Sequence, residues 1–180
     1  MVIDVQKAID ASYHAVHGPR NNPDAESRIA RLLDEWRTEQ RVIIHVRHDS
    51  TFSDSAYRPG QEGNQFKDEV APRRSELIVP KTTNSAFIGT TLERQLHSAG
   101  IRTLLITGVS TNNSVEATTR MAGNLGFETY LVADACFTFA KPDYNGVMRS
   151  ADEVHAMSLA NLDGEYCTVT DTATVLSDSE

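Results

Sequence analysis

Three polar side chains stand where apolar segments of the sequence end. Asp4 and Lys81 each directly follow an apolar run, and Ser114 lies shortly after the apolar run 103–109. A carboxyl group, an ammonium group and a hydroxyl group can together transfer a proton, stabilise a developing charge and bind a polar substrate. We therefore expect a catalytic or binding site where these three residues meet.

Each of the three residues also has an ordinary structural explanation. Asp4 could form a turn, Lys81 could be an exposed lysine at the end of a strand, and Ser114 could be the N-cap of a helix. The N-cap role is compatible with a place in a site. The three positions are far apart in the sequence, and their meeting at one edge of a sheet would favour the functional interpretation.

The elements that must position these residues alternate between strands and helices. Val2-Ile3 is a short strand, and Asn22 is predicted to cap a helix with Pro23 in its first turn. Ser150 and Glu153 form a capping box for a later helix. The segment 49–74 is polar and lacks a sustained period, and the C-terminal tail is polar. Further strands are expected at 41–47, 77–80, 103–109, 128–133 and 166–169, and further helices at 91–99 and 113–125.

This alternation predicts an α/β fold. We expect a single three-layer domain over residues 1–180, with a mostly parallel six-stranded sheet and helices on both of its faces. Such sheets bind ligands beyond the carboxyl ends of their strands, where the strand order reverses. Asp4, Lys81 and Ser114 are expected at such ends.

The composition excludes several classes of function. The 180 residues carry a formal charge of −8, which argues against general nucleic-acid binding. No apolar stretch approaches the ~20 residues that span a bilayer. Cys136 and Cys167 favour a reducing compartment and have no metal-binding spacing. We expect a cytoplasmic protein without a cofactor, whose partner is a small-molecule substrate, with no nucleic acid and no membrane.

Three stretches carry a resemblance to a known family. They are VIDVQ at 2–6, VPKTTNSAFIGTTLERQL at 79–96, and ITGVSTNNSVEATTRMAGNLGFETYLVADACFTF at 106–139. Together they resemble the isochorismatase-like, or cysteine hydrolase, superfamily. That resemblance implies a six-stranded parallel sheet and hydrolysis of small molecules such as nicotinamide, carbamoylated amines, ureides or the vinyl ether of isochorismate. Most members use an Asp–Lys–Cys triad, which maps onto Asp4, Lys81 and Ser114.

Ser114 departs from the family pattern. The pattern Gly-Val-x-Thr-x-x-Cys-Val is matched by GVSTNNSV, so a serine stands where the cysteine is expected. An alcohol ionises far less readily than a thiol and needs a general base in direct contact. Ser114 could belong to a branch that uses acid catalysis by the aspartate, could be an engineered replacement of cysteine, or could mark a protein that only binds a small molecule.

The resemblance completes the predicted site. It implies a cis peptide bond between Val109 and Ser110, and an oxyanion pocket formed by the backbone N–H groups of Ser110 and Ser114. Metal-binding relatives carry an Asp/His cluster after the second strand, but strand alternation separates the candidates in HVRHD at 45–49, so we expect no metal. Residues expected to bind the substrate are Gln6, Tyr13, Phe66 and Phe137.

We therefore expect a hydrolase that cleaves an amide C–N bond or a vinyl ether, with Asp4 as general acid/base and Lys81 as its charge partner. The alternative is a catalytically weak or inactive ligand-binding or regulatory protein with the same fold. We also expect a homo-oligomer, either a dimer or a tetramer. If Asp4 and Lys81 are in contact, the ion pair should lower the pKa of Asp4 more than burial raises it.

Overall fold

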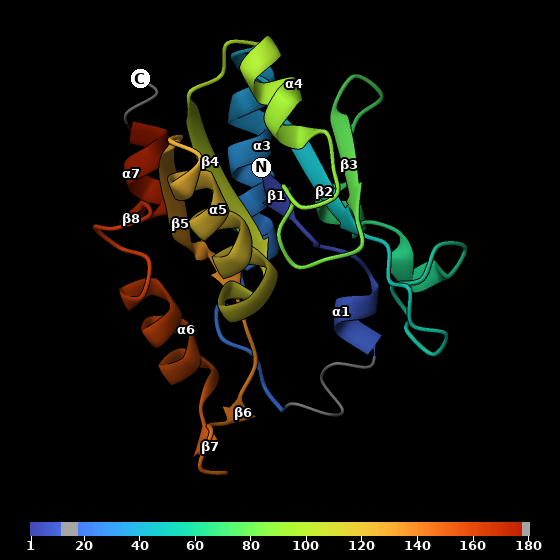
Figure 1. Ribbon diagram of the computed structural model, residues 1–180, viewed down its shortest axis with the longest axis vertical. Helices are drawn as coiled ribbons and strands as arrows, with labels where there is room; N and C mark the ends of the chain where they lie inside the picture. The colour runs from blue at the N-terminus through green and yellow to red at the C-terminus, as the bar shows by residue number, and fades with distance from the viewer. Residues whose placement is uncertain (12–17, 178–180) are drawn as a thin grey trace.

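The computed structural model describes residues 1–11 and 18–177, and a parallel six-stranded sheet runs through it (Figure 1). The strand order is β3-β2-β1-β4-β5-β8, which confirms the predicted α/β class. The strands are β1 (Val2–Ile3), β2 (Ile44–His48), β3 (Leu77–Lys81), β4 (Thr103–Val109), β5 (Glu128–Phe137) and β8 (Thr168–Thr170).

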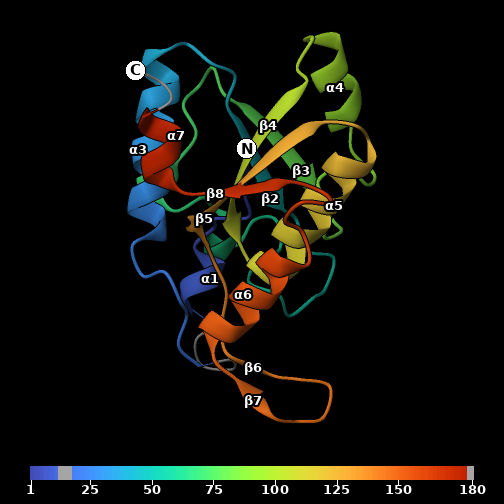
Figure 2. The ribbon, with the colours of Figure 1, turned by 90° about the vertical axis from the view of Figure 1, so that its left-hand side faces the viewer.

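Helices cover both faces of this sheet, which gives three layers (Figure 2). One face carries α1 (Ala8–Ala11), α3 (Ala25–Thr38) and α7 (Thr172–Ser177), and the other carries α4 (Leu92–Ser98), α5 (Glu116–Asn124) and α6 (Ala151–Ala160). A two-stranded hairpin, β6 (Lys141–Pro142) and β7 (Met148–Arg149), projects from one end of the molecule. Among residues 1–11 and 18–177, no helix has the length and apolar character needed to cross a membrane.

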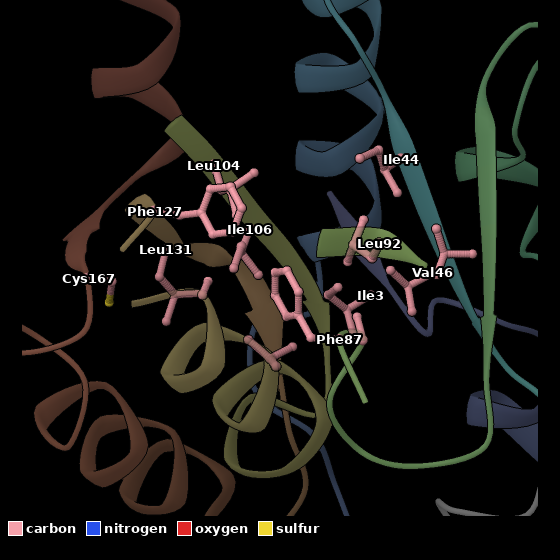
Figure 3. Packing of buried hydrophobic residues seen from close by; sticks show 14 of the residues in the cluster. Ile3, Ile44, Val46, Phe87, Leu92, Leu104, Ile106, Phe127, Leu131 and Cys167 are labelled. Atoms are coloured by element: carbon pink, nitrogen blue, oxygen red, sulfur yellow. The ribbon is translucent and has the colours of Figure 1, made fainter. Parts of the chain in front are cut away.

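Two apolar clusters hold the layers together. On the α4–α5 face, Phe87 and Leu92 cluster with two side chains of the sheet, Ile106 of β4 and Leu131 of β5 (Figure 3). On the opposite face, the apolar stripe of α3, which includes Ile29, packs against the sheet. Burying each such side chain stabilises the fold by about 1.5–3 kcal/mol. The two clusters therefore hold the strands, and the residues at their ends, in defined positions.

The strand order reverses between β1 and β4. The chain adds β2 and β3 on one side of β1, and then β4, β5 and β8 on the other. Gly108 pairs with Ile3 at this junction, and its φ of 131° lies in the region that favours glycine. A Cβ atom on Gly108 would overlap the backbone of Ile3, so β1 and β4 approach closely only because this residue has no side chain.

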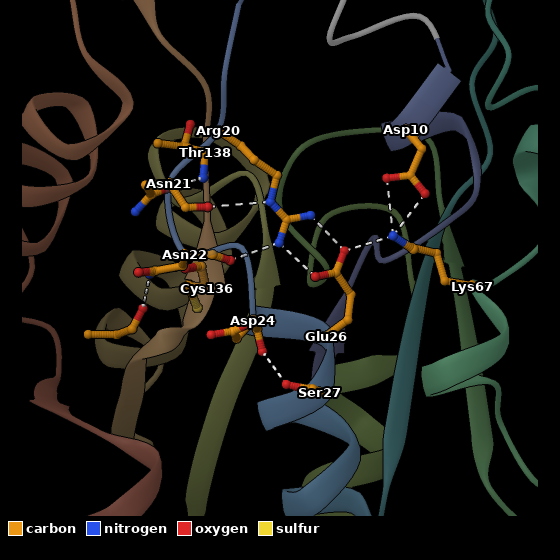
Figure 4. A network of polar contacts seen from close by, with 11 residues as sticks. Asp10, Arg20, Asn21, Asn22, Asp24, Glu26, Ser27, Lys67, Cys136 and Thr138 are labelled. Carbon is orange, nitrogen blue, oxygen red and sulfur yellow. Dashed lines mark hydrogen bonds and ion pairs between the residues drawn. The ribbon is translucent and has the colours of Figure 1, made fainter.

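The start of α3 differs from the prediction. Asn22 is not its cap, because α3 begins at Ala25 with Asp24 in the N-cap position. Asn22 has a φ of 43° and donates its side-chain N–H to the carbonyl of Cys136 at 2.7 Å (Figure 4). The amide side chain thus ties the loop before α3 to the end of β5, a long-range role that the local pattern could not reveal.

Beside it, four charged side chains join segments that are distant in sequence (Figure 4). Arg20 forms two hydrogen bonds to the Glu26 carboxylate, at 2.7 and 2.6 Å, and Lys67 donates to the same carboxylate at 2.8 Å. Lys67 also pairs with Asp10. Burial alone would raise the pKa of Glu26, but the bonds from Arg20 and Lys67 outweigh it and hold that pKa at about 2.

The polar C-terminal tail contains a helix, at residues 172–177, that was not predicted. This helix, α7, packs against α3 and β5. Its apolar residues Val175 and Leu176 join the cluster on that face. The helix is too short to show a clear period in the sequence, and it is stabilised by tertiary contacts.

Candidate active site

Asp4 lies directly after the two residues of β1, at the carboxyl edge of the sheet. Its φ is 54°, a left-handed conformation that aspartate tolerates better than most residues. Its N–H still donates to the carbonyl of Val46 at 3.0 Å, so the chain leaves the sheet immediately after a final bond to β2. This turn ends β1 early and interrupts the alternation of its side chains. The Asp4 residue is 5% exposed.

Lys81 ends β3 and points its ammonium group at Asp4. The Nζ atom lies 2.6 Å from Oδ2 of Asp4, 3.0 Å from the carbonyl oxygen of Thr83 and 3.3 Å from Oγ of Ser114. An ammonium group has three N–H bonds, and these three acceptors use all of them. Lys81 therefore holds one oxygen of Asp4 and the hydroxyl of Ser114 in fixed positions around itself.

Ser114 is carried by a π-helical turn, η3 (Thr111–Val115), which precedes α5. The predicted helix at 113–125 therefore begins differently from a regular α-helix. Thr111 anchors the turn, because its side chain hydrogen-bonds Nδ1 of His155 at 2.9 Å and its carbonyl accepts from Ser158 at 3.1 Å. Both anchors lie on α6, so their role could not be found from the sequence around Ser114.

The second oxygen of the Asp4 carboxyl group differs from the first in its surroundings. Oδ1 is buried and accepts no hydrogen bond within the described part of the chain, while Oδ2 is held by Lys81. Burial raises the pKa of Asp4, and this outweighs the opposing effects of Lys81, the Ser114 hydroxyl and His48. The prediction that the ion pair would lower this pKa is wrong, because the loss of water around the buried carboxyl group has a larger effect than the charge of Lys81.

The peptide bond between Val109 and Ser110 is cis. It lies at the end of β4, next in the sheet to the end of β1. Ser110 also lines a hollow of about 250 Å³, together with Asn113 and Thr138. Asn113 belongs to the turn that carries Ser114, so the hollow adjoins that turn, while Asp4, Lys81 and Ser114 do not line it.

The residues predicted to bind the substrate lie in different environments. Gln6 is fully buried, and its amide forms hydrogen bonds to the backbone of His48 and of Asn64. Phe137 is also fully buried, with the guanidinium carbon of Arg20 3.5 Å from its ring centroid. The structure therefore gives Gln6 a bracing role and Phe137 a packing role, and their contact with a substrate stays a prediction.

Phe66 is half-buried, with its backbone bridged to Gln6 and its ring edge-on to His45 at 5.6 Å. Tyr13 lies outside the described residues. In the segment 45–49, two of the candidate metal ligands have separate partners: His45 bonds Glu76 at 2.8 Å, and Asp49 binds Arg47. In residues 1–11 and 18–177, no group of three or more His, Cys, Asp or Glu side chains could hold a metal ion.

The arrangement defines a class of protein. A buried Asp–Lys pair at a strand-order reversal, a cis peptide bond and a small residue on a turn before a helix are present together. The family model described as the Isochorismatase domain matches residues 1–174, and the chain belongs to the isochorismatase family.

Several relatives agree with this assignment. An uncharacterized isochorismatase family protein of Bacillus subtilis, YrdC, is 41% identical over 99% of this chain and 94% of its own length. A crystal structure of an isochorismatase-family member from Chromobacterium violaceum ATCC 12472 superposes with a TM-score of 0.95 at 56% identity, covering 99% of this chain and 91% of that chain. Streptothricin hydrolase of Streptomyces noursei is 31% identical over 84% of this chain and 54% of its own length.

Proposed function

We propose that this protein hydrolyses a small molecule, cleaving an amide C–N bond or a vinyl ether, and that Asp4 is the general acid/base. The observation that supports this most is the asymmetry of the Asp4 carboxyl group. Lys81 binds Oδ2 at 2.6 Å, and Oδ1 is buried with no hydrogen-bond partner in residues 1–11 and 18–177. A carboxyl group in that state has one oxygen fixed and the other available to a substrate.

Burial raises the pKa of Asp4, which favours its protonated form and so its use as an acid. In an amide, the proton would go to the leaving nitrogen. In a vinyl ether, it would go to the terminal vinyl carbon, and water would then add to the adjacent carbon. Both reactions need an acid at one enclosed position.

Ser114 fits a hydrogen-bonding role better than that of a nucleophile. Its Oγ accepts from the Lys81 ammonium at 3.3 Å, and an ammonium group cannot remove the hydroxyl proton. No histidine is hydrogen-bonded to Ser114 among the described residues, unlike the arrangement that activates serine in Ser–His hydrolases. Ser114 therefore holds Lys81 in place and contacts the bound substrate.

The test is turnover of a small set of probes: p-nitroacetanilide, N-carbamoylglycine and an aryl vinyl ether. We expect Asp4→Asn to lower kcat by about 10²–10⁴-fold, because proton transfer contributes that much. We expect Ser114→Ala to keep the rate within about tenfold, because one hydrogen bond is lost, ~0.5–1.5 kcal/mol.

Asp68→Asn is the matched control, because Asp68 is exposed and pairs only at the surface with Lys7. Its rate should equal that of the wild type. Equal rates for Asp4→Asn and the wild type would contradict the proposal. Saturable binding of a probe without turnover would favour a ligand-binding protein on this fold.

A further inference from the structure

The end of β2 lies beside the end of β3 (Figure 1). His48 pairs with Lys81 in the parallel register, and the N–H of Asp49 donates to the Lys81 carbonyl at 2.8 Å. Paired residues of neighbouring strands have their side chains on the same face of a sheet. Val46 and Val79, two residues earlier, are paired in the same way and both belong to the apolar cluster on the α4–α5 face. His48 and Lys81 therefore project from the same face.

The backbone of His48 is held unusually firmly. Its N–H donates to Oε1 of Gln6 at 2.7 Å, and its carbonyl accepts from Nε2 of Gln6 and from Nδ2 of Asn64, each at 3.1 Å. Gln6 lies two residues after Asp4 in the sequence. The fully buried amide of Gln6 thus fixes the distance between the backbone that carries Asp4 and the backbone that carries His48.

The imidazole of His48 is not used in this bracing. Nδ1 is buried and has no hydrogen-bond partner within the described chain, although the ring packs edge-on to Tyr57 at 5.7 Å. A buried polar atom without a partner is costly and calls for a specific explanation. His155 uses its Nδ1 to anchor the Ser114 turn. His45 bonds Glu76 through Nε2, and its Nδ1 is also without a partner in the described chain, so His48 differs from it in having no partner at either ring nitrogen there.

The charged groups around His48 are Lys81, Asp4 and Asp49. Burial lowers the pKa of His48, and the positive charge of Lys81 lowers it further, while Asp4 and Asp49 oppose this. Asp49 is itself bound by Arg47 and Asn64. Burial therefore raises the pKa of Asp4, which favours its acid form, and lowers the pKa of His48, which favours its base form.

We propose that His48 is the second proton-transfer group of this site and accepts a proton from the attacking water. This rests on the hydrolase function proposed above. The oxygen of water forms a bond to the carbon under attack, and one proton of that water goes to the His48 ring.

The Asp4 proton goes to the leaving nitrogen of an amide as the C–N bond breaks. In an enol ether it goes to the terminal vinyl carbon, and addition of water to the adjacent carbon gives a hemiketal. The hemiketal C–O bond then breaks as its hydroxyl proton passes to the leaving oxygen. One proton must then pass from His48 to Asp4 to restore the starting state. The sum is the addition of one water molecule to the substrate. No oxidant or further reactant is required.

The first experiment needs no turnover. Long-range ¹H–¹⁵N spectra report the protonation of each histidine ring, and His48→Gln assigns the signal of interest. We expect His48 to titrate below the ordinary value of about 6.5 and to shift upward in Lys81→Met, where a neighbouring positive charge is lost. A His48 pKa at or above the ordinary value, or one that does not change in Lys81→Met, overturns the proposal.

The second experiment measures kcat and KM for the most rapidly hydrolysed of the three probes. We expect His48→Gln to lower kcat by about 10²–10⁴-fold with little change in KM, and to remove the acid limb of the pH–rate profile. His97→Gln is the matched control, because His97 is an exposed histidine of α4 whose ion-pair partner is Glu93. It should keep the rate and the profile of the wild type.

The outcomes separate the two proposals. If the wild type hydrolyses a probe and His48→Gln keeps its kcat and pH profile, the role of His48 is refuted while the hydrolase function stands. If the wild type hydrolyses none of the probes, the proposed function fails and the role of His48 fails with it.

Discussion

Replacing Ser114 by cysteine tests whether this position faces the reactive centre. The Ser114 Oγ atom lies 3.3 Å from the Lys81 ammonium, where a negative charge gains about 5 kcal/mol at an effective dielectric constant of about 20. Burial and the Asp4 carboxyl group oppose this gain. We therefore take the ordinary thiol pKa of about 8.5 for the introduced group, with no lowering by Lys81 included.

The two native cysteines provide an internal comparison. Burial raises the pKa of Cys136 to about 12 and that of Cys167 to about 11. Near pH 7, a thiol with a pKa of about 8.5 is roughly 3% thiolate, against about 0.01% for one of about 11, a ratio of about 300. The introduced thiol should therefore alkylate at least about 100-fold faster than Cys167.

The assay is iodoacetamide labelling followed by mass spectrometry of the peptides. Adding Lys81→Met to Ser114→Cys should slow the labelling, because the stabilising charge is lost. If the introduced thiol labels no faster than Cys167, position 114 does not face the Asp4–Lys81 pair in the way described, and the reasoning about this site fails. Gain of amidase activity in Ser114→Cys would show that the site retains the nucleophilic mechanism and that the serine replaced a cysteine.

Two further predictions concern the fold around the site. Glu26 and Glu76 both have their pKa values held at about 2, so each stabilises the fold above its ordinary pKa of about 4.5, and that stability is lost as the pH falls toward 2. Lowering each pKa from about 4.5 to about 2 is worth about 3 kcal/mol of stability. The free energy of unfolding measured in urea should therefore fall markedly between about pH 5 and 3, and it should fall less in Glu26→Gln. An equal fall in that variant would contradict the assignment. Gly108→Ala should lower the free energy of unfolding by at least about 3 kcal/mol, because its Cβ would meet the Ile3 backbone. Gly60→Ala has open space around its Cβ, so it should lower the free energy of unfolding by only about 1–2 kcal/mol, from its positive φ.

The sequence predicted the fold well because its signals were local and repeated. The apolar run 103–109 and the capping box at Ser150 need no tertiary information, and both are present in the structure. Asp4, Lys81 and Ser114 were found because each follows a strand, and a parallel sheet brings strand ends together.

What the sequence could not predict depends on long-range contacts. Asn22 is a typical helix cap by type, yet it binds the end of β5, more than a hundred residues away. Gln6 was predicted to bind the substrate, and the sequence did not reveal that its amide braces the backbone of His48. The direction of the Asp4 pKa shift was also wrong, since it depends on how completely the folded chain encloses the carboxyl group.

The central claim is that the buried Asp4 carboxyl group holds a proton above the ordinary pH range of an aspartate. The most direct test is a pH titration by ¹³C NMR of protein labelled at the aspartate carboxyl carbons, with the Asp4 signal identified by its loss in Asp4→Asn. The account predicts that this signal titrates clearly above the ordinary value of about 3.9, because burial outweighs the ion pair with Lys81. A signal that titrates at or below that value would show that Lys81 keeps Asp4 ionised, and would contradict its role as the acid.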